Sequence, residues 1–221
     1  MKKIIDEYPK QMRALVLHAV ADLRLETVPV PELTAGCVLL QVQACGICSS
    51  DRERVFVTGT YHFPTIPGHE FAGRIVAVAD DVDEALLGRR ASVFPMLPCR
   101  TCDACKAKQY AQCSNYNYFG SRCDGGFAEY LVVPVWNLVP FDDALPYETA
   151  ALCEPSAVSL HAVTIGAVKK GETVAVVGTG TIGFLVAAFA KNLTDRVVIC
   201  GRSENKLVYA RKLGFETVDL T

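Results

Sequence analysis

The first two thirds of the chain carry short apolar stretches that prolines and glycines separate. One of them alternates, with Leu40 and Val42 on one face and Gln41 and Gln43 on the other, as a half-buried strand requires. Six stretches have the length of single strands: 13–17, 23–28, 38–44, 71–79, 90–94 and 128–133. Their spacing predicts a mostly antiparallel, barrel-like sheet.

A different pattern begins near residue 161, where apolar strands alternate with helices. The predicted elements are strands over 173–177, 196–200 and 215–220, and helices over 181–191 and 204–213. This alternation favours a parallel sheet with right-handed crossovers. We therefore expect an α/β chain of two domains, with a β-rich domain over residues 1–160 and a parallel α/β domain over 161–221. So few parallel strands leave an open edge, so we expect a piece of a longer protein.

Composition and charge narrow the class of protein. Of the 221 residues, 51% are apolar and 21% charged, which excludes general disorder. The net charge of -2 argues against binding to nucleic acid or to an anionic membrane by bulk electrostatics. The N-terminus lacks the apolar core of a signal peptide, and glycines interrupt the uncharged stretch 173–190. We expect a cytoplasmic protein without a membrane span.

Four closely spaced cysteines lie in a polar, irregular excursion over residues 95–124. They are Cys99, Cys102, Cys105 and Cys113. Without an export signal, clustered cysteines favour metal over disulfides, and four thiolates suit a closed, structural Zn2+ site. The alternatives are unrelated cysteines, an iron–sulfur cluster, and a zinc ribbon for nucleic acid, which would usually have basic surroundings.

A second set of metal-type ligands is scattered along the chain. Cys48 lies in a turn, His69 and Glu70 are adjacent, and Glu154 precedes a proline. A thiolate, an imidazole and a carboxylate can hold Zn2+ and leave one position open. Taken singly, each residue has a structural explanation as a small buried thiol, a turn histidine or a helix cap. On spacing alone, Cys45 competes with Cys48.

A glycine pattern joins a predicted strand to a predicted helix. Its members are Gly178, Gly180, Thr181, Ile182 and Gly183. Glycines at this junction permit a tight turn and close approach of the backbone to a pyrophosphate, which the free N–H groups of the helix would bind. The pattern predicts a dinucleotide site in a Rossmann-type domain.

The end of the next predicted strand bears on the choice of dinucleotide. Gly201 and Arg202 stand where a carboxylate would bond the ribose of NAD. Loss of the acid removes repulsion of a 2′-phosphate, and the guanidinium can pair with one. The sequence therefore mildly favours NADP over NAD, unless Arg202 merely stacks on the adenine or points to solvent.

These motifs, taken in order, resemble the zinc-dependent medium-chain alcohol dehydrogenases. The Glu154–Pro155 segment resembles that of the polyol branch, such as sorbitol dehydrogenase. Residues 119–127 resemble the corresponding segment of the galactitol-1-phosphate 5-dehydrogenases. The segments that carry the resemblance are 46–51, 68–70, 99–113, 125–130, 154–155 and 178–183.

The resemblance implies a GroES-like catalytic domain followed by a truncated Rossmann domain. Cys48 and His69 become ligands of a catalytic zinc, Glu70 and Glu154 complete or exchange in its shell, and Ser50 matches a proton-relay hydroxyl. Two Zn2+ ions per chain are implied, with hydride transfer between a secondary alcohol and NAD(P). We expect a small-molecule alcohol substrate, homo-oligomers of the full-length protein, and little turnover from this chain alone.

Two other functions remain open from the sequence. One is a zinc-stabilised dinucleotide-binding sensor without turnover, and the other is a zinc-ribbon interaction module. Substrate identity is open too, although Arg52, Arg54 and Arg122 could meet a sugar phosphate.

Overall fold

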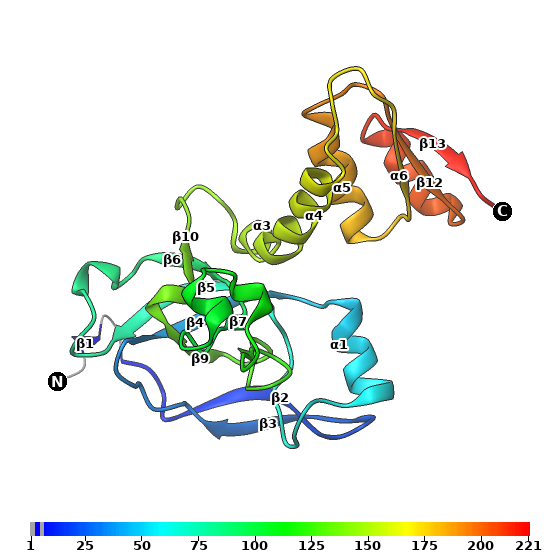
Figure 1. Ribbon diagram of the computed structural model, residues 1–221. Helices are drawn as coiled ribbons and strands as arrows, with labels where there is room; N and C mark the ends of the chain where they lie inside the picture. The colour runs from blue at the N-terminus through cyan, green and yellow to red at the C-terminus, as the bar shows by residue number, and fades with distance from the viewer. Residues whose placement is uncertain (1–2, 5–6) are drawn as a thin grey trace. The chain divides into compact units, whose positions relative to one another are not determined.

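The computed structural model describes residues 3–4 and 7–221. Their contacts divide the chain into two compact units, of which the first ends at Cys153 and the second begins at Glu154. The change of sequence pattern near residue 161 lies inside helix α4 (Cys153–Ile165), which the sequence analysis did not predict. The fold is mixed α/β, with antiparallel strands in the first unit and parallel strands in the second (Figure 1).

An antiparallel sheet dominates the described part of the first unit. Its strand order is β10-β6-β5-β4-β9, and β1 pairs with β5. The strands are β1 (Lys3–Ile4), β4 (Cys37–Gly46), β5 (Glu70–Val78), β6 (Arg90–Val93), β9 (Tyr130–Pro134) and β10 (Leu138–Pro140). A hairpin of β2 (Gln11–Ala19) and β3 (Asp22–Pro29) lies outside this sheet. The six predicted strands are all present.

The central strand β4 is buried on both faces along its first half. Val38 and Leu40 belong to one apolar cluster, and Leu39 belongs to another with Met12 and Val16 of β2. The sequence predicted one polar face for this strand. In the structure Gln43 is the one exposed residue of β4, because β2 covers the face of the first half that carries Leu39.

Short helices and turns complete the first unit. They are α1 (Ser49–Glu53), η1 (Arg54–Thr58), η2 (Glu84–Leu86), α2 (Asp103–Lys106), η3 (Tyr110–Gln112), η4 (Val135–Asn137) and α3 (Tyr147–Ala150). The irregular excursion holds α2, η3 and a two-stranded sheet of β7 (Met96–Leu97) and β8 (Asn117–Tyr118). The excursion therefore has little regular structure to hold it.

The second unit is a parallel sheet in the order β11-β12-β13. The strands are β11 (Val174–Val177), β12 (Val197–Gly201) and β13 (Glu216–Asp219), and the helices after α4 are α5 (Thr181–Lys191) and α6 (Glu204–Lys212). Val176 and Ile199 of the sheet pack with Ala187 of α5 and Ala210 of α6. Among the described residues, no helix combines the length and the apolar character needed to cross a membrane.

Candidate active site and metal centres

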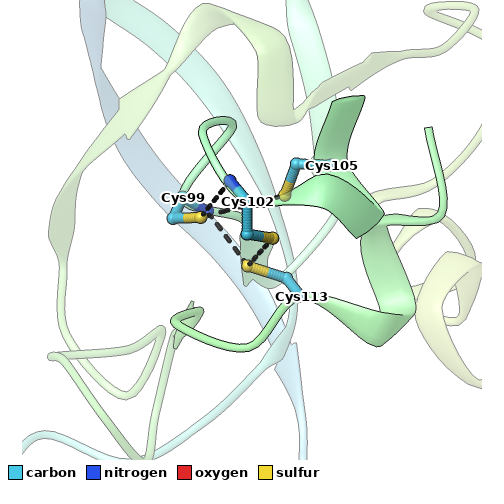
Figure 2. A group of neighbouring side chains, drawn as sticks. All are labelled: Cys99, Cys102, Cys105 and Cys113. Carbon is cyan, nitrogen blue, oxygen red and sulfur yellow. Dashed lines mark hydrogen bonds between the residues drawn. The ribbon is translucent and has the colours of Figure 1, made fainter. Parts of the chain in front are cut away.

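The four cysteines of the excursion converge on one point (Figure 2). The sulfur of Cys99 lies 4.0 Å from that of Cys105, and the sulfur of Cys102 lies 3.9 Å from that of Cys113. A tetrahedral site with Zn–S bonds of about 2.3 Å has sulfurs about 3.8 Å apart. The four side chains therefore fit a closed zinc site.

The electrostatics of these cysteines also point to a cation. The hydroxyl and backbone amide of Thr101, together with the amide of Cys102, lower the pKa of Cys99 to about 5. Burial raises the pKa of Cys105 to about 12, and the neighbouring thiols add to this rise. Four thiolates at this spacing repel one another, so a metal ion is needed to hold all of them deprotonated.

An aromatic cluster fixes the loop beside the four cysteines. The guanidinium of Arg100 lies 4.8 Å from the ring centroid of Trp136, and the ring of Tyr110 lies 5.0 Å from it. Phe94 meets the same indole at 5.7 Å. The sequence analysis missed this cluster, because Trp136 lies more than twenty residues beyond Cys113.

Cys48, His69 and Glu70 form a second cluster, with one ligand atom from each within 4.8 Å of the others. Cys48 lies just before α1, and Glu70 opens β5 opposite Gly46 of β4. A Cβ atom at Gly46 would lie 2.3 Å from a carboxylate oxygen of Glu70, so a larger residue there would displace this carboxylate.

Asp51 orients the imidazole of this second cluster. Its Oδ1 lies 3.1 Å from Nδ1 of His69, and its Oδ2 accepts a hydrogen bond of 3.0 Å from the backbone N–H of Cys48. Both Asp51 and His69 are buried. A carboxylate at Nδ1 holds the tautomer that leaves the lone pair on Nε2 for a metal. Sequence analysis noted Asp51 three residues after Cys48 but gave it no role.

Two neighbours of this cluster differ in role. Ser50 accepts a hydrogen bond of 2.8 Å from Nη1 of Arg54, which lies 3.9 Å from Asp51. Burial raises the pKa of Cys45, and the charges of Asp51 and Glu70 raise it further. The cluster found among the described residues does not include Cys45, which agrees with leaving this thiol out of the ligand set.

Close backbone contacts between glycines hold the segment that leads into His69. The amide of Gly126 donates to the carbonyl of Gly68 over 2.9 Å, and Asp124 accepts from the amide of Ile66 over 2.8 Å. A Cβ atom at Gly125 would lie 2.0 Å from the carbonyl oxygen of Gly68. The glycine pair after Asp124 is therefore explained by packing rather than by chemistry.

Glu154 belongs to a different compact unit from the three residues of the second cluster. It is in the first turn of α4 and opens the second unit, whereas Cys48, His69 and Glu70 belong to the first. Its part in the metal shell stays a prediction.

The glycine turn leaves room for a ligand at two positions and none at the third. Gly178 has a φ of +128°, and a Cβ atom at Gly178 or Gly180 would meet nothing within 4 Å. At Gly183, a Cβ atom would lie 2.1 Å from the carbonyl oxygen of Gly178. Thr181 and Ile182 begin α5 directly after this turn. Open space over a turn at a helix N-terminus fits a pyrophosphate.

Gly201 ends β12 close to this turn. A Cβ atom there would lie 2.5 Å from Cγ2 of Thr179, so the strand end packs against the glycine turn itself. Arg202 follows and is exposed. Asp219 of β13 is the partner of Gly201 in register, and its carboxylate accepts from Thr221. Sequence analysis missed Asp219, because only the pairing of β12 with β13 brings this acid next to Gly201.

The model of the alcohol dehydrogenase GroES-like domain matches residues 34–143. Galactitol 1-phosphate 5-dehydrogenase of Escherichia coli K12 is 36% identical, over 92% of this chain and 59% of its own length. Sorbitol dehydrogenase of Bacillus subtilis 168 is 35% identical, over 93% and 60%. The chain thus spans about three fifths of the length of these relatives.

Solved structures show the same similarity. A protein described as a zinc-binding dehydrogenase of Sinorhizobium meliloti 1021, bound to NADP, has a TM-score of 0.91 and 33% identity over 96% of this chain and 62% of its own. An alcohol dehydrogenase of Escherichia coli CFT073, complexed with NADH, has a TM-score of 0.89 and 28% identity over 96% and 64%. The resemblance found in the sequence is confirmed: residues 34–143 match the alcohol dehydrogenase GroES-like domain, and the chain is similar over nearly its whole length to zinc-dependent alcohol and polyol dehydrogenases.

Proposed function

We propose that the protein is a zinc-dependent oxidoreductase that transfers hydride between a secondary alcohol of a polyol or sugar and NAD(P). The observation that carries the proposal is the cluster of Cys48, His69 and Glu70. It combines a thiolate, an imidazole and a carboxylate in the domain that the family uses for catalysis. The sensor considered from the sequence has no support among the relatives described above.

Two groups supply the reactive chemistry when they are bound. Zn2+ supplies Lewis acidity toward an alcohol oxygen, and the nicotinamide supplies the hydride acceptor. Cys48 and His69 would hold the catalytic ion, with Glu70 or Glu154 completing the shell, and the four cysteines of the excursion would hold a structural ion. Two ions per chain follow from these two donor sets.

Ser50 would move the proton of the alcohol. One lone pair of its oxygen accepts from Arg54, so the hydroxyl hydrogen points away from that guanidinium. The second lone pair can take a proton from a substrate hydroxyl while the serine proton passes outward. Asp51 keeps His69 in one tautomer throughout, and the buried pair excludes water from that side of the site.

The glycine turn would hold the dinucleotide. Gly178 and Gly180 leave the space that the pyrophosphate needs, and Gly183 lets α5 pack close to β11. Gly201 offers no carboxylate to the ribose, and Arg202 is exposed beside it. These two residues support a preference for NADP over NAD.

The proposal is tested on the full-length, zinc-loaded protein with a series of polyols and both cofactors. We expect reduction of nicotinamide with at least one polyol, abolished in Cys48→Ala and in His69→Ala. His18→Ala is the matched control, since His18 pairs with Glu26 on the β2–β3 hairpin. Near wild-type activity in His69→Ala would overturn the assignment of the open site.

A further inference from the structure

Arg122 is held between two tyrosine rings. Its guanidinium carbon lies 3.9 Å from the ring centroid of Tyr61 and 4.5 Å from that of Tyr116. The backbone of Arg122 is fixed on both sides, because its N–H donates to Tyr118 over 3.0 Å and its carbonyl lies 3.2 Å from Nε2 of His62. Such stacking holds the planar guanidinium in one orientation at little entropic cost on binding.

The side chains of Tyr61 and Tyr116 hydrogen-bond to this guanidinium and take up part of its donors. The Nε atom of Arg122 is buried and has no hydrogen-bond partner among the described residues. No carboxylate in the described part of the chain forms an ion pair with it. The Arg122 side chain as a whole is half-buried, so an arriving anion would be bound by its Nη groups rather than by the buried Nε.

Arg90 shows what the same arrangement looks like when it is structural. Its guanidinium also lies between two rings, 3.9 Å from Tyr147 and 4.9 Å from Phe141. The Nε atom of Arg90 is buried and without a hydrogen-bond partner as well, so the difference lies in Nη1, which in Arg90 donates to the backbone carbonyl of Asp143. Arg90 therefore ties the start of β6 to the segment around Asp143, whereas no side-chain bond of this kind to a backbone carbonyl is found for Arg122 in the described residues.

Arg122 lies in the turn after Tyr118, whose ring contacts the second metal cluster. The ring of Tyr118 meets the imidazole of His69 edge-on, with centroids 5.8 Å apart. The carbonyl of Tyr118 accepts the amides of Ser121, Arg122 and Cys123, so one tight turn joins the ring on His69 to the clamped guanidinium. A substrate that reaches the cluster with one hydroxyl can extend toward this turn.

The other two arginines named from the sequence have different surroundings. Arg54 donates to Ser50 and lies beside Asp51, so its charge is engaged next to the metal cluster. Arg52 is exposed on α1, where a solvated side chain is the ordinary case. Of the three, Arg122 alone is both rigidly held and unpaired by a carboxylate in the described residues.

We propose that Arg122 binds the phosphate of a phosphorylated polyol and sets the preference of the site for such substrates over uncharged polyols. The proposal rests on the proposed function, since it places a phosphate relative to that site. The guanidinium fork matches two phosphate oxygens, and Tyr61 and Tyr116 keep the fork in place.

Binding to the zinc-loaded chain tests the proposal directly, with glycerol 3-phosphate as the probe and glycerol as its uncharged match. Titration calorimetry is combined with the 15N resonance of the Arg122 Nε. We expect Arg122→Met to weaken glycerol 3-phosphate by about ten- to a hundredfold and Arg122→Lys to weaken it less, because charge-assisted bonds are lost in full or in part. Arg52→Met, a matched loss of one positive charge, should leave the affinity unchanged.

Three outcomes would overturn the proposal. These are equal affinity of wild type and Arg122→Met for the probe, no shift of the Arg122 Nε resonance, or inorganic phosphate binding as tightly as glycerol 3-phosphate. In the full-length protein, Arg122→Met should raise KM for a phosphorylated polyol and spare an uncharged one. Probe binding through Arg122 without oxidation of any polyol would overturn the proposed function alone.

Discussion

Replacing Asp51 with asparagine should weaken the second metal site and leave the first intact. Asp51 faces two donors, the backbone N–H of Cys48 at 3.0 Å and Nδ1 of His69 at 3.1 Å. An asparagine has only one oxygen, so its NH2 group must face one of these donors. The strain is relieved when His69 moves its proton to Nε2 and accepts from the amide at Nδ1.

This change of tautomer determines how much zinc affinity the second site loses. Nε2 then bears a proton instead of the lone pair that a metal needs. Loss of an outer-shell partner usually costs ten- to a hundredfold in metal affinity, which is about 1.4–2.7 kcal/mol. The four-cysteine site shares no residue with Asp51 and should keep its affinity.

The assay is a zinc titration against a competing chelator, with long-range 15N–1H spectra to identify the tautomer of His69. We expect two binding steps in wild type and a weakened second step in Asp51→Asn. Asp22→Asn is the matched control, because Asp22 pairs with exposed Arg24 on the hairpin. The reasoning is wrong if the second step is unchanged, or if both steps weaken equally.

Four more outcomes follow from the structure. Gly183→Ala should unfold the second unit more easily, by about 1–3 kcal/mol in a thermal melt, because its Cβ would press on backbone; Gly180→Ala should melt like wild type yet bind dinucleotide more weakly. Cys99→Ser should make residues 95–124 sensitive to protease and lower the melting temperature, and a chelator should mimic it in wild type; equal protease resistance would contradict the structural zinc. Arg202→Gln should reduce the ratio of NADP to NAD affinity by about ten- to a hundredfold in a titration with both cofactors, and an unchanged ratio would remove Arg202 from the choice. Glu129→Gln should lower the free energy of unfolding in urea by at most about 1 kcal/mol near neutral pH. Hydrogen bonds from Arg13 lower the pKa of Glu129, so the wild type should lose this advantage as the pH falls below about 4.3. A difference between the two proteins that persists at acid pH would contradict a stabilising pair of Arg13 and Glu129.

The structure also changes how the cofactor choice is best tested. From the sequence alone, Gly201→Asp is the natural substitution. A Cβ atom at Gly201 would meet Thr179 at 2.5 Å, so the added acid would disturb the glycine turn as well as the ribose contact. Arg202→Gln avoids this clash because Arg202 is exposed.

Periodicity predicted the elements of the second unit well. The helix expected over 181–191 coincides with α5, and the three strands lie within a residue or two of their expected positions. Continuous apolar strands and a glycine turn are local signals, so they can be recognised without tertiary information. Helix α4 was missed because its apolar residues show almost no sidedness along Cys153–Ile165.

The sequence predicted the metal ligands of the two sites but not the residues that hold these ligands in place. Four cysteines in fifteen residues are a local signal, whereas Trp136 reaches the cluster only through the fold. Asp51 was adjacent in sequence to named residues, but nothing in a sequence shows that a carboxylate meets an imidazole eighteen residues away. The clamp around Arg122 joins Tyr61 to Tyr116 and could be found only in three dimensions.

The most direct test of the account is the zinc content of the purified, folded chain. We predict two zinc ions per chain by elemental analysis, falling to one in Cys48→Ala and to one in Cys99→Ser if that chain still folds. Circular dichroism would show that Cys48→Ala keeps its secondary structure. One zinc ion in wild type, iron in place of zinc, or no loss in Cys48→Ala would contradict the account.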